Sequence, residues 1–99
     1  MSNNPSLIDG AKKTAALLKV MSNENRLLIL CTLMNQEMSV SELNEHINLS
    51  QSALSQHLAV LRREKVVETR RESQTIYYLV KSPEIIRLLN VLHELFCAE

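Results

Sequence analysis

The fold is decided by the stretch LSQSALSQHLAVLRR, residues 49–63. At about 100° per residue of an α-helix, Leu54, Leu58 and Leu61 fall on one side, and that side requires a core. The opposite side carries small, uncharged side chains at its N-terminal end and arginines at its C-terminal end. Hydroxyls and amides suit the edges of bases, and arginines suit phosphates. We therefore interpret the stretch as a recognition helix.

The residues before this stretch predict a second short helix and a turn. Ser39 followed by Glu42 matches a capping box, and residues 40–47 then carry apolar side chains on one side. Asn48-Leu49 predicts a tight turn, and Ser50 can cap the helix that follows. This order is typical of a helix-turn-helix, although an ordinary pair of antiparallel helices in a small bundle gives a similar pattern.

A β-hairpin is predicted directly after the recognition helix. Residues 66–70 and 75–80 are rich in β-branched and aromatic side chains, and residues 71–74 form a polar connection. A hairpin in this place is a wing. Its tip would carry Arg70, Arg71 and Gln74 towards the minor groove or the backbone of DNA.

Three further helices are predicted, over residues 6–21, 24–35 and 83–97. The second of them is apolar nearly all round, so we expect it to be central and buried. The last is too apolar to pack on one side only, which predicts a homodimer formed through the first and last helices. The fold class is mainly α with a β-hairpin wing (α+β), in the order α-α-α-α-β-β-α. One domain spans residues 1–99, with residues 1–5 expected to be disordered.

Composition narrows the class of protein. The 99 residues hold 11 Lys and Arg against 11 Asp and Glu, so the formal net charge is zero. This argues against a protein that binds polyanions through its overall charge. Residues 57–72 are locally basic. A local basic surface can bind nucleic acid, but charge alone favours an ordinary solvated, charged face. No apolar run is long enough to span a membrane, and no signal peptide is present, so we expect a cytoplasmic protein without a membrane partner.

The chain resembles the ArsR/SmtB family, whose members are small homodimeric winged helix-turn-helix transcription regulators of bacteria. The resemblance rests on SQSALSQHL (residues 50–58), on the tail Ile76-Tyr77-Tyr78, on residues 21–27 and on the helix order. It covers almost the whole chain. It implies that a dimer binds double-stranded operator DNA with an inverted repeat.

Many members of that family sense metals, yet this chain departs from their sites. Ser39 and Ser41 stand where the commonest site has two cysteines, and hydroxyls are poor ligands for soft metals. For the second family site the last helix offers Glu84, His93 and Glu94, of which Glu84 and His93 do not share a turn. We predict no metal and no cofactor.

The resemblance is closer to the HlyU-like branch and its sulfide- and redox-sensing relatives. That branch has one cysteine in the middle of the second helix and one near the end of the last, where this chain has Cys31 and Cys97. The resemblance implies a reversible disulfide or polysulfide bridge. The alternative is that both are inert, since free cysteine behaves as a small buried hydrophobe and no C-x-x-C occurs.

The predicted DNA contacts fall into four groups. Base edges are assigned to the polar face of the recognition helix, phosphates to the arginines at its end, and the minor groove or backbone to the wing. His57 lies at the border of core and surface, and either a phosphate contact or a core position would suit it. The residues are Gln51, Ser52, Ser55, Gln56, His57, Arg62, Arg63, Arg70, Arg71 and Gln74.

Other classes of function fit the sequence poorly. An enzyme would need a glycine-rich phosphate loop, a nucleophile elbow or a carboxylate–histidine cluster, and the sequence has none of these. A helical protein-interaction module would not explain a wing placed directly after a Ser/Gln-faced helix. A regulator of the same fold that senses nothing remains as the alternative to a thiol switch.

Overall fold

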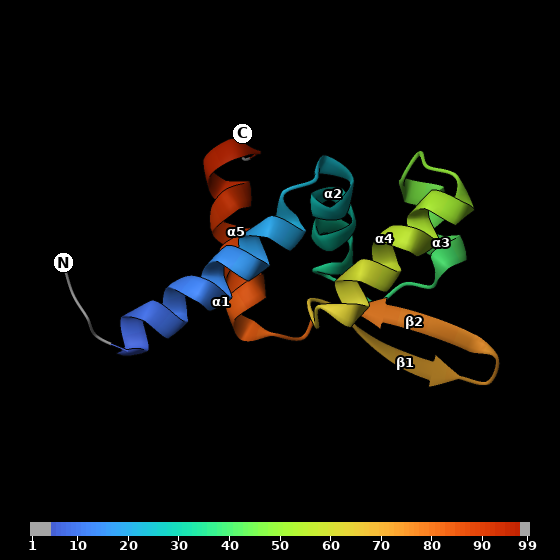
Figure 1. Ribbon diagram of the computed structural model, residues 1–99. Coiled ribbons are helices and arrows are strands. Elements are labelled where there is room, and N and C mark those ends of the chain that lie inside the picture. Colours follow the sequence, from blue (N-terminus) through green and yellow to red (C-terminus); the bar gives the residue numbers. More distant parts are fainter. Residues whose placement is uncertain (1–4, 98–99) are drawn as a thin grey trace.

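The computed structural model describes residues 5–97, which form five helices and one antiparallel hairpin in the predicted order (Figure 1). The bounds are α1 (Pro5–Met21), α2 (Glu24–Leu33), α3 (Val40–His46), α4 (Gln51–Arg63), β1 (Glu68–Glu72), β2 (Thr75–Leu79) and α5 (Pro83–Phe96). The predicted class, mainly α with a β-hairpin wing, is confirmed.

Helix α4 is anchored by the three leucines that its sequence placed on one side. Leu54, Leu58 and Leu61 are each 0% exposed and join one core with Leu30 of α2 and Leu43 of α3. Burying one such side chain contributes about 1.5–3 kcal/mol to folding. The opposite side of α4 is thereby held at the surface.

The turn between α3 and α4 is built by side-chain hydrogen bonds. The capping box of α3 is present, because Ser39 Oγ accepts from the Glu42 N–H at 3.2 Å and Glu42 Oε1 accepts from the Ser39 N–H at 3.0 Å. Asn44 Nδ2 donates to the Leu49 carbonyl at 2.7 Å and to the Ile47 carbonyl at 3.3 Å. Ser50 Oγ then caps α4 by accepting from the backbone N–H three residues on, at 3.1 Å.

The hairpin begins later and turns more tightly than predicted. Glu72 pairs with Thr75, so the turn is Ser73-Gln74 alone, with Ser73 in the left-handed region at φ 58°. The strand expected over residues 66–70 lies two residues further on, at Glu68–Glu72, and Val66 and Val67 are instead buried in the core, at 2% and 1% exposure. Their β-branched side chains therefore reflected burial rather than strand pairing.

The base of the wing is tied to the chain just before α3. Met38 donates its N–H to the Tyr78 carbonyl at 3.1 Å and accepts from the Tyr78 N–H at 2.8 Å. This antiparallel bridge adds a third stretch of backbone beside β2. The wing is thus fixed relative to the helix-turn-helix at its base.

Several predicted helix ends need correction. Pro5, expected to be disordered, is the first residue of α1, a position that proline favours; residues 1–4 lie outside the described residues. Helix α2 ends at Leu33, and it is not buried all round because Leu28 is 49% exposed. The N-caps of α2 and α5 are Asn23 and Ser82.

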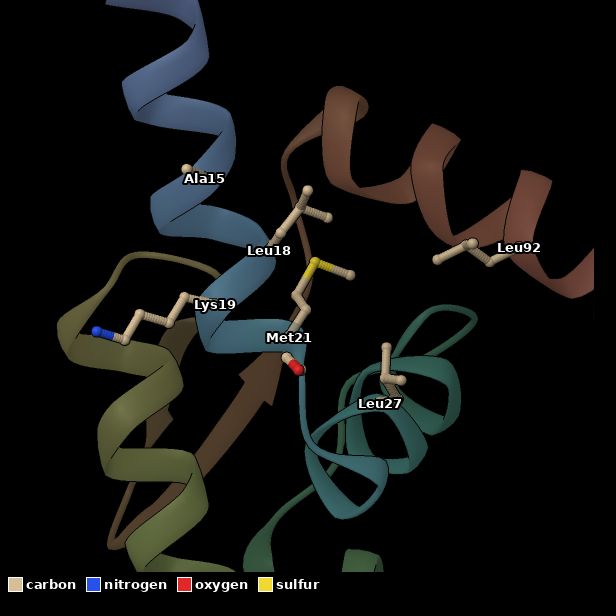
Figure 2. Close-up of a pocket in the computed structure, with 7 residues that line it drawn as sticks. Ala15, Leu18, Lys19, Met21, Leu27 and Leu92 are labelled. Atoms are coloured by element: carbon tan, nitrogen blue, oxygen red, sulfur yellow. The ribbon is translucent and has the colours of Figure 1, made fainter.

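An open apolar groove lies where α1, α2 and α5 meet. Figure 2 shows Leu18 and Met21 of α1, Leu27 of α2 and Leu92 of α5 directed towards it, and its volume is about 480 Å³. Large apolar side chains elsewhere on α1 and α5 are also exposed, among them Phe96 at 79%. Within residues 5–97, no helix has the length and apolar character needed to cross a membrane.

We predict that Asn44→Ala destabilises the fold, because it removes the side-chain donor of the Leu49 carbonyl in the α3–α4 turn. The Ile47 carbonyl keeps the Leu49 N–H as a donor, at 2.9 Å. The expected loss is about 1–3 kcal/mol in the free energy of unfolding, measured by urea denaturation. Asn48→Ala is the matched control, since this exposed amide of the same turn makes no such bond. Equal stability of the two variants would contradict the assigned role of Asn44.

Candidate nucleic-acid interface

The exposed side of α4 carries six of the residues predicted to contact DNA. All six are exposed: Gln51, Ser52, Ser55, Gln56, Arg62 and Arg63. By helix periodicity Ser52, Gln56 and Arg63 lie opposite the buried leucines, and the other three lie along one flank. The N-terminal half of this surface offers hydroxyls and amides, and the C-terminal half offers guanidinium groups. We call these six residues the reading face.

His57 lies on the flank of α4, away from the reading face. It is half-buried, and its Nδ1 accepts a hydrogen bond from Arg26 Nε at 3.3 Å. Arg26 also donates from Nη1 to the Val20 carbonyl at 3.2 Å. Of the two readings of His57, the geometry favours a packed histidine with a satisfied partner. The contact joins residues 31 positions apart in the chain, so no local sequence pattern could indicate it.

Arg70 is not at the tip of the wing, and its charge is already paired. It lies in mid-strand opposite Tyr77, with its guanidinium 4.8 Å from the centre of that ring. Its Nε donates to the two carboxylate oxygens of Glu37 at 2.9 and 3.1 Å, and its Nη2 contacts both Glu37 and Glu72. The prediction that the tip carries Arg70 was wrong, because the strand extends further than expected.

Arg71 and Gln74 are the predicted wing residues that remain available. Gln74 is exposed in the turn itself, and Arg71 is exposed in the last pairs of the hairpin, opposite Ile76. Within residues 5–97, Arg71 makes no ion pair with a carboxylate. The wing therefore presents one unpaired guanidinium and one amide close to its tip.

The two cysteines line one cavity between α2 and α5. Cys31 is half-buried, Cys97 is exposed, and the cavity of about 340 Å³ is otherwise lined by apolar side chains and His93. Burial raises the pKa of the Cys31 thiol, and the neighbouring Cys97 sulfur raises it further. The fold thus brings together two thiols that are 66 positions apart (97 − 31) in the sequence.

Metal ligands are not gathered in the described part of the chain. Across residues 5–97, no three His, Cys, Asp or Glu side chains are grouped so that they could hold a metal ion. Ser39 uses its hydroxyl to cap α3, and Glu84 accepts a hydrogen bond from Ser82 at 2.9 Å. His93 lines the thiol cavity.

Comparison with known proteins agrees with this geometry. The family described as "Bacterial regulatory protein, arsR family" matches residues 23–69. The transcriptional activator HlyU of Vibrio cholerae is 53% identical over 85 residues, which cover 86% of this chain and 79% of that protein. A biofilm growth-associated repressor of Xylella fastidiosa is 43% identical, covering 90% of this chain and 78% of its own length. The chain belongs to the ArsR family.

A solved structure extends the agreement to the arrangement of the elements. Reduced HlyU from Vibrio cholerae superimposes with a TM-score of 0.88 at 47% identity, over 96% of this chain and all of that one (100%). The winged helix-turn-helix architecture and the resemblance to the HlyU-like branch are therefore confirmed. HlyU is a transcriptional activator and the Xylella fastidiosa protein is a repressor, so this member of the ArsR family is a transcription regulator and not an enzyme.

We predict that Glu37 titrates below the ordinary glutamate value of about 4.3, because the hydrogen bond from Arg70 lowers the pKa of its carboxyl. The pair then adds stability that is present above the ordinary value and is lost as the pH falls through the lowered one. Carboxyl ¹³C shifts followed by NMR across acid pH measure this. Arg70→Gln should return Glu37 towards the ordinary value, and Arg71→Gln, the adjacent control, should leave it lowered.

Proposed function

We propose that the chain is a bacterial regulator that binds an inverted-repeat operator as a homodimer, and that thiol chemistry at Cys31 and Cys97, not a metal, changes its affinity for DNA. The observation that carries the thiol part is that both cysteines line one cavity. The alternative is a constitutive repressor or antirepressor with inert cysteines. Because bacterial DNA lies in the cytoplasm, the proposed function is a cytoplasmic one.

The DNA part of the proposal rests on the reading face and the wing. Glutamine amides can bond adenine through two hydrogen bonds, and serine can serve several bases, so Gln51, Ser52, Ser55 and Gln56 are proposed to contact base edges. Arg62 and Arg63 are proposed phosphate contacts, and Arg71 and Gln74 extend the contact from the wing. Arg70 is the weakest candidate, because Glu37 and Glu72 already neutralise it.

The dimer is supported by the apolar surface of α1, α2 and α5. The groove in Figure 2 is lined by Leu18, which at 50% exposure is too exposed for a monomer's core. Leu95 of α5 is also exposed, at 68%. A contiguous apolar surface on a small domain favours association. Two-fold symmetry would present two α4 helices to neighbouring major grooves, about 34 Å apart.

The proposed switch converts two thiols into one bridge. When Cys31 and Cys97 form a disulfide, both S–H bonds break, one S–S bond forms, and two protons and two electrons leave to an oxidant. With a polysulfide as the reactant, one or more sulfur atoms are retained between the two sulfurs, and the remaining sulfur leaves reduced. Either bridge ties the end of α5 to the last turn of α2.

Such a bridge would act on DNA binding through the dimer. Helix α5 contributes to the proposed dimer surface, and α2 packs against α4 in the core. Fixing α5 against α2 would change the relative orientation of the two recognition helices, and a dimer reads two half-sites only at a matched spacing.

We predict that Gln56→Ala lowers the preference for the operator by about 1–3 kcal/mol, the value of one good base contact. Fluorescence anisotropy with the operator and with an unrelated duplex measures it. Affinity for the unrelated duplex should be unchanged, because the phosphate contacts remain. Operator preference equal to that of the wild type would remove Gln56 from the set of base-reading residues.

We predict that Cys31→Ser and Cys97→Ser each bind the operator as tightly as the reduced wild type but lose its response to diamide and to sodium tetrasulfide. Serine has nearly the size of cysteine and cannot form the bridge. Anisotropy gives the affinity, and intact mass gives the loss of two hydrogens or the gain of sulfur. A wild type that forms the bridge without a change in affinity, or variants that respond as it does, would favour the inert alternative.

A further inference from the structure

A basic notch lies between the end of α1, the first turn of α2 and the last turn of α4. Its volume is about 430 Å³. Lys19, Arg26 and Arg63 bring positive charge to it from three different helices, Val20 and Val60 contribute apolar surface, and Glu64 is its one acidic side chain. We call this feature the Arg26 notch.

The charge of the notch is not balanced internally. Glu64 is engaged with Arg63, whose Nε lies 3.3 Å from its carboxylate. In the part of the chain that the structure describes, neither Lys19 nor Arg26 forms an ion pair with a carboxylate. Two positive charges therefore face the notch without a partner, which favours an anion.

Arg26 is held in place by neutral acceptors. The Val20 carbonyl and the His57 ring nitrogen take its Nη1 and Nε protons, at 3.2 and 3.3 Å. These bonds fix the guanidinium and leave its full charge in place. Lys19 extends from α1 on the side of α4, as Figure 2 shows. A fixed guanidinium beside an ammonium on a flexible stem is a suitable pair for a phosphate oxygen.

The notch adjoins the reading face on the side away from the wing. Arg63 belongs to both surfaces, and Figure 1 shows α1 and the tip of the hairpin on opposite sides of α4. A helix in a major groove is flanked by the two phosphate backbones. If α4 reads bases, the wing faces one backbone and the notch faces the other.

We propose that the Arg26 notch binds a backbone phosphate of the operator, across the major groove from the wing. This inference rests on the proposed function, since it requires α4 to enter the groove. The contact carries no sequence information. It fixes the angle at which α4 lies in the groove, as phosphate contacts generally fix orientation. The residues involved, Lys19 and Arg26, lie outside the helix-turn-helix.

The test is the salt dependence of DNA binding by Lys19→Gln. Each neutralised phosphate contributes about 0.9 to the slope of log K against log salt concentration. Loss of one contact in each protomer should therefore make the slope shallower by about 1.8 for a dimer. Affinity for the operator and for an unrelated duplex should fall by the same factor. Arg26→Gln should act in the same direction.

The control is Lys13→Gln, on the same helix, because Lys13 is already paired with Asp9 at 3.1 Å. Its slope should equal that of the wild type. Thermal unfolding and sedimentation check that each variant folds and keeps the wild-type oligomeric state. If Arg26→Gln unfolds, the slope of Lys19→Gln alone is enough to test the proposal. A slope unchanged by Lys19→Gln would overturn only the proposed phosphate contact at the Arg26 notch. A wild type that binds no operator would overturn both the proposed function and this contact.

Discussion

The burial of Leu54, Leu58 and Leu61 is the constraint on which the rest of the structure depends. These side chains are fully removed from water, so α4 can rotate about its axis only at the cost of exposing them. The opposite side of the helix carries most of its polar side chains, and so it stays at the surface. The same leucines meet α2 and α3, which set the positions of the turn and of the base of the wing.

Local chemistry made much of this fold predictable from the sequence. Ser39, Asn23 and Ser82 cap helices within a few residues of themselves, and the leucine spacing of α4 repeats along one helix. The bounds of the hairpin were harder to predict because β-branched residues occur both in strands and in buried loops of the core. Val66 and Val67 fill the core, and the left-handed Lys65 and Ser73, at φ 63° and 58°, set where the strand begins and turns. Nothing in the sequence around them marks those two conformations.

The candidate site was predictable only where a residue acts alone. The exposed amides and hydroxyls of α4 need no partner, and their positions follow from helix periodicity. Arg70 and His57 depend instead on Glu37 and Arg26, which are 33 and 31 positions away in the chain. An arginine near a wing tip and an arginine neutralised by a distant carboxylate look the same in the sequence, and only the tertiary fold separates them.

The apolar surface links the proposed dimer to the thiol cavity. Phe96 is 79% exposed and also lines the cavity that holds Cys31 and Cys97. A partner protomer that covers Phe96 would thereby narrow the access of a reactant to both sulfurs. A bridge between the sulfurs would in turn reposition Phe96 against the partner. Because coupling between two sites is reciprocal, the affinity of the protomers for each other and the ease of bridging would change together, and α4 would transmit that change to the DNA.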